Sequence, residues 1–123
     1  MTPRITFFTE GVNEYHPFPF LDVVELADGY LVQVELAGVE PEAVSVSVTR
    51  DALVIEGERP PRYPEGARKV LRMELSYGRF RRELELPADA DASGVTARWT
   101  RGLLWVRVPR HTVRHAVEIE VDE

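Results

Sequence analysis

Apolar and polar residues alternate with a period of two through most of the chain between residues 20 and 109. The alternation is cleanest in residues 44–49, which read VSVSVT, and residues 30–36 place four apolar side chains on one face. Successive side chains of a β-strand point to opposite faces, so this period predicts strands with one buried face. The predicted strands span residues 20–26, 30–36, 44–49, 53–58, 70–75, 79–86, 95–99 and 103–108.

Turn-forming residues separate these segments at intervals of about 8–12 residues, and no stretch keeps the 3.6-residue period of a helix. This spacing predicts an all-β fold, an antiparallel sandwich or barrel. The length of 123 residues allows one domain. We expect an aromatic-rich arm over residues 1–19, which prolines interrupt, a β domain over residues 20–109, and a tail over residues 110–123.

The formal net charge is −6, and acidic and basic residues are mixed along the chain. Binding to nucleic acid requires a basic surface or stripe, so we expect no nucleic-acid partner. No apolar run reaches the roughly 18 residues of a membrane span. The first residues lack the charged-then-apolar pattern of a secretory signal, and a cytoplasmic protein without membrane contact is expected.

Candidate catalytic groups are few, and none forms a recognisable set. The chain has no phosphate-binding loop of the type G-x-x-x-x-G-K-[ST], so it is not expected to hydrolyse ATP. His111 and His115 lie four residues apart, but Pro109 argues against the helix that would bring both to one zinc ion. Asp89 and Asp91 resemble a carboxylate pair and are expected to be solvated. We therefore expect no enzymatic activity, no metal and no cofactor.

The chain carries several short motifs, which are, in order, Leu36-Ala37-Gly38-Val39, Gly57-Glu58-Arg59, residues 76–82 (SYGRFRR), Leu86-Pro87, and Ala97 with Gly102-Leu103-Leu104 running to Val108-Pro109-Arg110. In this order they resemble the small heat-shock proteins, over an α-crystallin domain from about residue 20 to residue 109. The family often has proline where this chain has Ala37, and often asparagine where it has Arg101. The N-terminal arm is also short.

The resemblance implies an immunoglobulin-like antiparallel β-sandwich with a flexible N-terminal arm and C-terminal tail. It also implies a homodimer that builds larger homo-oligomers. Such a protein is an ATP-independent holdase, which binds unfolding client proteins, prevents their aggregation and passes them to ATP-driven chaperones. The alternative is a co-chaperone or interaction adaptor of the same sandwich type, similar to a CS domain, and the native mass would separate the two.

The tail carries a second alternating segment, in which Val117, Ile119 and Val121 fall on one side of an extended chain. We predict that this segment docks into an apolar groove of a neighbouring subunit. The pairs Val117/Ile119 and Ile119/Val121 both fit such a peg. The alternative is a last edge strand of the tail's own sandwich.

By resemblance, the groove lies between the strands at residues 44–49 and 95–99. Val44, Val46 and Val48 form the apolar row of the first strand. In the second strand the face that lines the groove stays open, although a large aromatic such as Trp99 favours the core. Thr96 would then line the groove.

The segment at residues 70–75 follows a loop rich in proline, which suits a strand exchanged between subunits. In bacterial and plant-type relatives the corresponding strand pairs with the partner's first strand, here residues 20–25. The alternative is a strand within its own sheet. The predicted dimer-interface residues are Val70, Leu71, Arg72, Met73 and Arg82.

Two further predictions concern a charge and a group of aromatic residues. Arg82 shares a face with apolar neighbours, so either its side chain extends to solvent or its guanidinium is partly buried at the dimer interface, held by a carboxylate or by carbonyl groups. The family resemblance favours the second. Phe7, Phe8 and Phe18 of the arm are expected to bind clients, because exposed clusters of phenylalanine are unusual on a plain monomer. The alternative is that they pack on their own domain.

Overall fold

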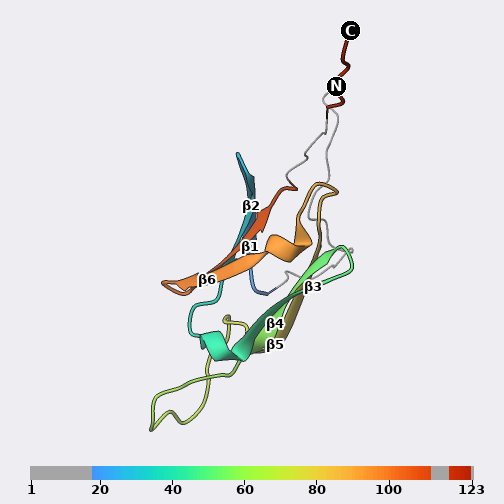
Figure 1. Cartoon of the computed structure of the whole chain (residues 1–123). Helices are drawn as coiled ribbons and strands as arrows, with labels where there is room; N and C mark the ends of the chain where they lie inside the picture. Colours follow the sequence, from blue (N-terminus) through green and yellow to red (C-terminus); the bar gives the residue numbers. More distant parts are fainter. Residues whose placement is uncertain (1–17, 112–116, 123) are drawn as a thin grey trace, which may run out of the picture.

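The computed structural model describes residues 18–111 and 117–122, which contain two antiparallel β-sheets facing one another (Figure 1). The four-stranded sheet has the order β1 (Leu21–Leu26), β2 (Gly29–Glu35), β7 (Leu103–Pro109), β6 (Thr96–Thr100). The three-stranded sheet has the order β3 (Val44–Thr49), β4 (Ala52–Arg59), β5 (Gly78–Glu85). Two short 3-10 turns, η1 (Pro41–Ala43) and η2 (Ala92–Gly94), precede β3 and β6. The prediction of an antiparallel β-sandwich is confirmed.

Seven of the eight predicted strands are present, and each lies within one residue of its expected bounds. The exception is residues 70–75, which form no strand and belong to the long connection between β4 and β5. Leu71 is 85% exposed and Leu75 is 64% exposed. The alternating pattern is there, but a strand also needs a neighbour for its backbone hydrogen bonds. The alternative of a strand within its own sheet is therefore wrong for this chain.

The core lies between the two sheets and follows the period of two. On β2, Tyr30, Val32 and Val34 are buried, while the residues between them are more exposed. The facing sheet contributes the alternate residues Leu53 and Ile55, both fully buried. The other buried apolar residues of this cluster are Leu36, Val39, Phe80, Leu84, Leu86, Leu104, Val106 and Val108. The alternation read from the sequence thus selects the buried face correctly.

Two glycines are required by the backbone around them. At the β6–β7 turn, Arg101 and Gly102 both have positive φ, 54° and 78°, as a tight turn between twisted strands requires. Gly29 begins β2, where a Cβ atom would lie 2.3 Å from the carbonyl oxygen of Val108 on β7. Any side chain at residue 29 would therefore push apart the two central strands of the four-stranded sheet.

Candidate functional site: assembly surfaces at the edges of the sandwich

A cleft of about 270 Å³ lies at one edge of the sandwich, between β3 and β6. These two strands are the outermost strands of their sheets. Val46, Val48 and Thr96 line the cleft, as the sequence predicted. The fourth predicted residue, Val44, lies in the same half-buried row of β3 and packs against the core. The remaining lining residues are Ser47, Ala92, Val95 and Ala97.

The register of β6 on β7 settles which face of β6 lines the cleft. Ala97 lies opposite Val106 and Trp99 opposite Leu104, and both partners are buried in the core. The inward face of β6 therefore packs Trp99 against the core, as expected, and also lines the cleft through Ala97. Thr96 lies opposite Arg107 on the outward face of β6 and lines the cleft as well. Ala97 could have been predicted to face inward from the alternation of buried and exposed residues on β7, but only once the pairing of β6 with β7 is known.

The predicted peg residues of the tail are not used by their own chain. Val117, Ile119 and Val121 are 83%, 84% and 79% exposed. Residues 117–122 pair with no strand of the described chain, so the alternative of an additional edge strand is wrong. Within the described residues, a row of apolar side chains is thus exposed, and a cleft at the edge of the same domain is open. Docking of one on the other remains a prediction.

The opposite edge of the sandwich is formed by β1 and β5, and Arg82 lies there, on the inward face of β5. Its side chain is buried, and Nη1 donates a hydrogen bond to the carbonyl oxygen of Pro19, at 2.6 Å. The alternative in which Arg82 extends to solvent is therefore wrong. The carbonyl group that holds the guanidinium belongs to the same chain. The role of Arg82 in a dimer interface is not tested by these contacts.

The connection between β4 and β5, residues 60–77, projects away from the two sheets (Figure 1). We name it the exchange arm. Leu71, Met73 and Leu75 form an apolar row with the spacing of one strand face, and all three are exposed. Val70 is 45% exposed. Arg72 is paired with Glu74 within the arm, at 2.6 Å. The predicted interface residues of the arm are thus solvent-exposed, and none of them belongs to the core cluster.

Arg59, the last residue of β4, joins the root of the exchange arm to the domain. Its Nε donates to the carbonyl oxygen of Ser76 at 2.8 Å, and its Nη1 donates to that of Ala37 at 3.2 Å. The guanidinium also lies 4.2 Å from the ring centroid of Phe18 and 5.6 Å from that of Tyr77. The sequence places Arg59 in the motif Gly57-Glu58-Arg59 but predicts none of these contacts, because the partners come from three distant segments.

The predicted client-binding aromatics divide into two groups. Phe7 and Phe8 lie outside the described residues. Phe18 is half-buried, with its ring edge-on to Phe80 at 5.5 Å between centroids. For Phe18 the contacts fit the alternative, in which the side chain packs on its own domain, and its binding to clients stays a prediction.

The two aspartates of the loop before β6 have structural partners. Asp91 begins η2 and accepts hydrogen bonds from the backbone amide and the hydroxyl of Ser93. These hydrogen bonds lower the pKa of Asp91 below its ordinary value. Asp89 accepts hydrogen bonds from Tyr30 and Arg110, while its side chain stays 49% exposed, so this carboxylate is solvated and also has partners within the chain. The described residues hold no group of three side chains suited to a metal ion, and none of their helices could span a membrane.

Comparison with known proteins assigns this architecture to a family. The family model described as "Hsp20/alpha crystallin family" matches residues 22–122. The chain is similar to small heat shock protein C2 of Rickettsia felis, with 26% identity over 93% of this chain and 81% of that protein. It is 36% identical to the 17.8 kDa class I heat shock protein of Solanum lycopersicum over 76% of this chain, but spans only 62% of that relative's length.

Solved structures agree with this assignment. A small heat-shock protein from Xylella fastidiosa, described as having a distinct high order structure, superposes with a TM-score of 0.73 and 30% identity. The match covers 85% of this chain and 96% of that one. The hspA protein from Xanthomonas axonopodis gives a TM-score of 0.68 at 33% identity, over 75% of this chain and 92% of that one.

Proposed function

Because the chain belongs to the Hsp20/alpha crystallin family, we propose that it acts in the cytoplasm as an ATP-independent holdase, which binds unfolding proteins and keeps them from aggregating. The small heat-shock proteins among its relatives support a chaperone role. The observation that carries the proposal is that three elements with apolar side chains are open to solvent within the described residues: the β3–β6 cleft, the tail row and the exchange-arm row. Uncovered apolar surface that can be covered reversibly is what a holdase requires.

The tail is proposed to dock into the cleft of a neighbouring subunit. Burying two of its aliphatic side chains contributes a gross 3–6 kcal/mol, about the range for two such residues. Ordering the tail costs a comparable amount, so one tail binds weakly. Many tails on one assembly hold it together through their high effective concentration. The connection over residues 110–116 spans about 25 Å at most, which is enough to reach an adjacent subunit.

The exchange arm is proposed to add its apolar row as a strand to β1 of a partner. β1 is the outermost strand of its sheet, so its outer backbone groups have no neighbouring strand within the described residues. Val23 and Val24, on opposite faces of β1, are 39% and 42% exposed. A strand added at this edge would gain main-chain hydrogen bonds and cover apolar surface. The resulting unit is a dimer, with Arg82 and the arm residues at its interface.

Clients are proposed to bind the aromatic arm and the clefts that open when tails dissociate, before transfer to ATP-driven chaperones. Unfolding proteins expose apolar surface, and burial yields about 25 cal/mol per Å². A single-copy adaptor, similar to a CS domain, needs neither the exposed tail row nor the exchange arm. The adaptor alternative is therefore not favoured.

Aggregation of a heat-labile client provides the test. The protein at a near-stoichiometric ratio should suppress light scattering of heated citrate synthase without nucleotide, whereas an equal mass of albumin should not. Phe7→Ser with Phe8→Ser should weaken this protection, with the melting temperature of the β domain unchanged. Unchanged scattering with excess protein would refute the holdase, and a single species of 14.0 kDa at tens of micromolar would favour the adaptor.

A further inference from the structure

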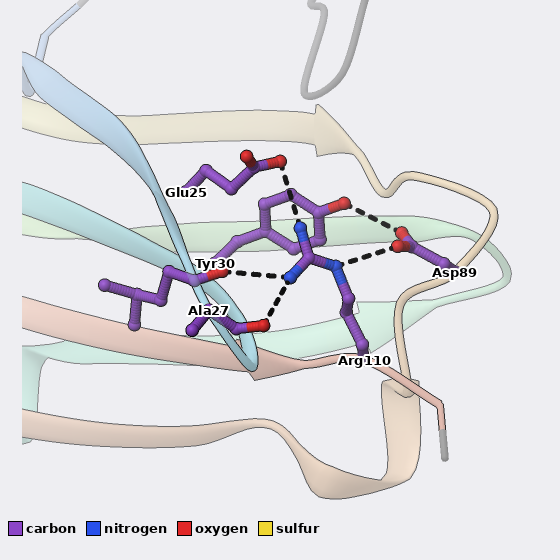
Figure 2. A network of polar contacts seen from close by, with 6 residues as sticks. Glu25, Ala27, Tyr30, Asp89 and Arg110 are labelled. Atoms are coloured by element: carbon purple, nitrogen blue, oxygen red, sulfur yellow. Dashed lines mark hydrogen bonds and ion pairs between the residues drawn. The ribbon is translucent and has the colours of Figure 1, made fainter. Parts of the chain in front are cut away.

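Arg110, the first residue after β7, is held by both its backbone and its side chain. Its amide donates a hydrogen bond to the carbonyl oxygen of Asp28, at 3.0 Å. Nη1 donates to the carbonyl oxygens of Leu26 and Ala27, both at 2.9 Å, and Nη2 contacts a carboxylate oxygen of Glu25 at 3.0 Å. The guanidinium thus caps the end of β1 and the β1–β2 turn (Figure 2).

The other side of the same guanidinium holds the loop after β5. Nε donates to Oδ2 of Asp89 at 3.0 Å, while the hydroxyl of Tyr30 donates to Oδ1 of the same carboxylate at 2.8 Å. The guanidinium carbon lies 4.9 Å from the centroid of the Tyr30 ring. The next residue, His111, donates its amide to the carbonyl oxygen of Asp89 at 2.9 Å. Two successive amides at the root of the tail are therefore bonded to the domain.

This network differs from the other ion pairs on the surface. The Arg72–Glu74 pair has both side chains more than 70% exposed, and such pairs contribute little to stability. The side chain of Arg110 is 28% exposed and joins two carbonyls, two carboxylates and a ring from three segments. A planar guanidinium can serve several acceptors at fixed angles, which the single ammonium of lysine cannot.

We propose that Arg110 is a positioning residue, a clasp that sets the direction in which the tail leaves the domain and couples this direction to the end of β1. The inference rests on the proposed docking of the tail into a neighbouring subunit. When the first residues of a tail are fixed, the tail samples fewer directions. Its effective concentration is then higher at a neighbouring subunit that lies in the favoured direction and lower at subunits placed elsewhere. The clasp thereby selects a narrow range of assembly sizes.

The clasp also links the two proposed contacts between subunits. Glu25, Leu26 and Ala27 lie at the end of the edge strand that would receive the partner's exchange arm. Both proposed contacts between subunits therefore meet at one guanidinium.

Arg110→Lys tests the clasp, because it keeps the charge and removes the multiple contacts. Amides 110 and 111 should exchange with deuterium about tenfold faster, as expected when local opening no longer has to break the clasp. In native mass spectrometry, the Arg110→Lys variant should show a broader distribution of assembly sizes and a larger fraction of dimers than the parent protein. The matched control is Arg107→Lys, which makes the same replacement at an arginine whose ion pair is with Asp28 rather than with Asp89 or Glu25. It should change neither measurement.

Removing residues 117–123 in both backgrounds separates the clasp from the function on which it rests. If Arg110 acts through the tail, Arg110→Lys leaves the mass of the truncated protein unchanged. An equal effect with and without the tail would show that the residue acts on the domain and would contradict the clasp. If truncation reduces the assemblies to dimers but Arg110→Lys has no effect in the full chain, tail docking stands and the clasp is refuted. An assembly that survives truncation unchanged would refute tail docking, and the clasp's role in assembly with it.

Discussion

Ile119→Ala is the substitution that most directly tests assembly through the tail. Both possible registers of the peg, Val117/Ile119 and Ile119/Val121, use this residue. Its side chain is 84% exposed in the isolated chain, so nearly its whole surface is available for burial on docking. The substitution removes three carbons, worth about 0.8 kcal/mol each when buried. The expected loss is about 2.4 kcal/mol for each docked tail, or roughly 60-fold in its affinity.

The same substitution should leave the domain intact. Ile119 makes no contact with the core, and exposed substitutions of this kind change the free energy of unfolding by about 0.5 kcal/mol at most. Sedimentation velocity over a dilution series should show large assemblies giving way to dimers at much higher protein concentration than in the parent. Glu118→Ala is the matched control, because it shortens a side chain on the opposite side of the same extended segment.

Two results would refute this reasoning. If Ile119→Ala keeps the parent mass across the dilution series, the isoleucine is not buried at a contact between subunits. If Glu118→Ala causes an equal loss of mass, the tail contributes through its charge or its backbone, and the calculation from apolar burial is wrong.

Three further predictions address the cleft, the buried arginine and pH. Ala97→Arg should place a long charged side chain in the cleft and reduce the sedimenting mass as Ile119→Ala does, whereas an unchanged mass would place the docking site elsewhere. Arg82→Ala should lower the free energy of unfolding in urea by about 1–3 kcal/mol, because the buried carbonyl of Pro19 loses its donor; a value equal to the parent's would contradict this. Burial, followed by the hydrogen bond to Asp89, raises the pKa of Tyr30 above its ordinary value of 10.0, so the folded state keeps a proton that the unfolded state loses. The free energy of unfolding should therefore fall as the pH rises above 10.0, and Tyr30→Phe should reduce that fall in denaturant titrations at about pH 9 and about pH 11.

The strands of the sandwich could be predicted because they depend on a local pattern. Residues 44–49 alternate strictly, so both the strand and its inward row of Val44, Val46 and Val48 follow from side-chain period alone. The inward face of β6 did not follow, because Val95, Ala97 and Trp99 form a row that two different surfaces could accept. Only the pairing of β6 with β7 assigns that row to the core and the cleft together.

Contacts between residues far apart in the chain could not be predicted from the sequence either. Tyr30 and Asp89 are 59 positions apart, and Arg110 lies 21 positions beyond Asp89, so no spacing rule joins them. The same holds for Arg59, which contacts Phe18 and Ser76. Such clusters form where loops from both sheets meet, and a period of two carries no information about that meeting.

The sequence by itself determined the all-β class, seven strands, the buried face of β2 and the apolar spacing of the tail, because each depends on residues close together in the chain. The tertiary structure alone decided that residues 70–75 stay unpaired, since a strand requires a neighbouring backbone and none within the described chain lies beside them. It also decided that Ala97 lines the cleft and that Arg110 holds the root of the tail. Both positions depend on which strands become neighbours, and long-range packing of the whole sandwich sets that choice.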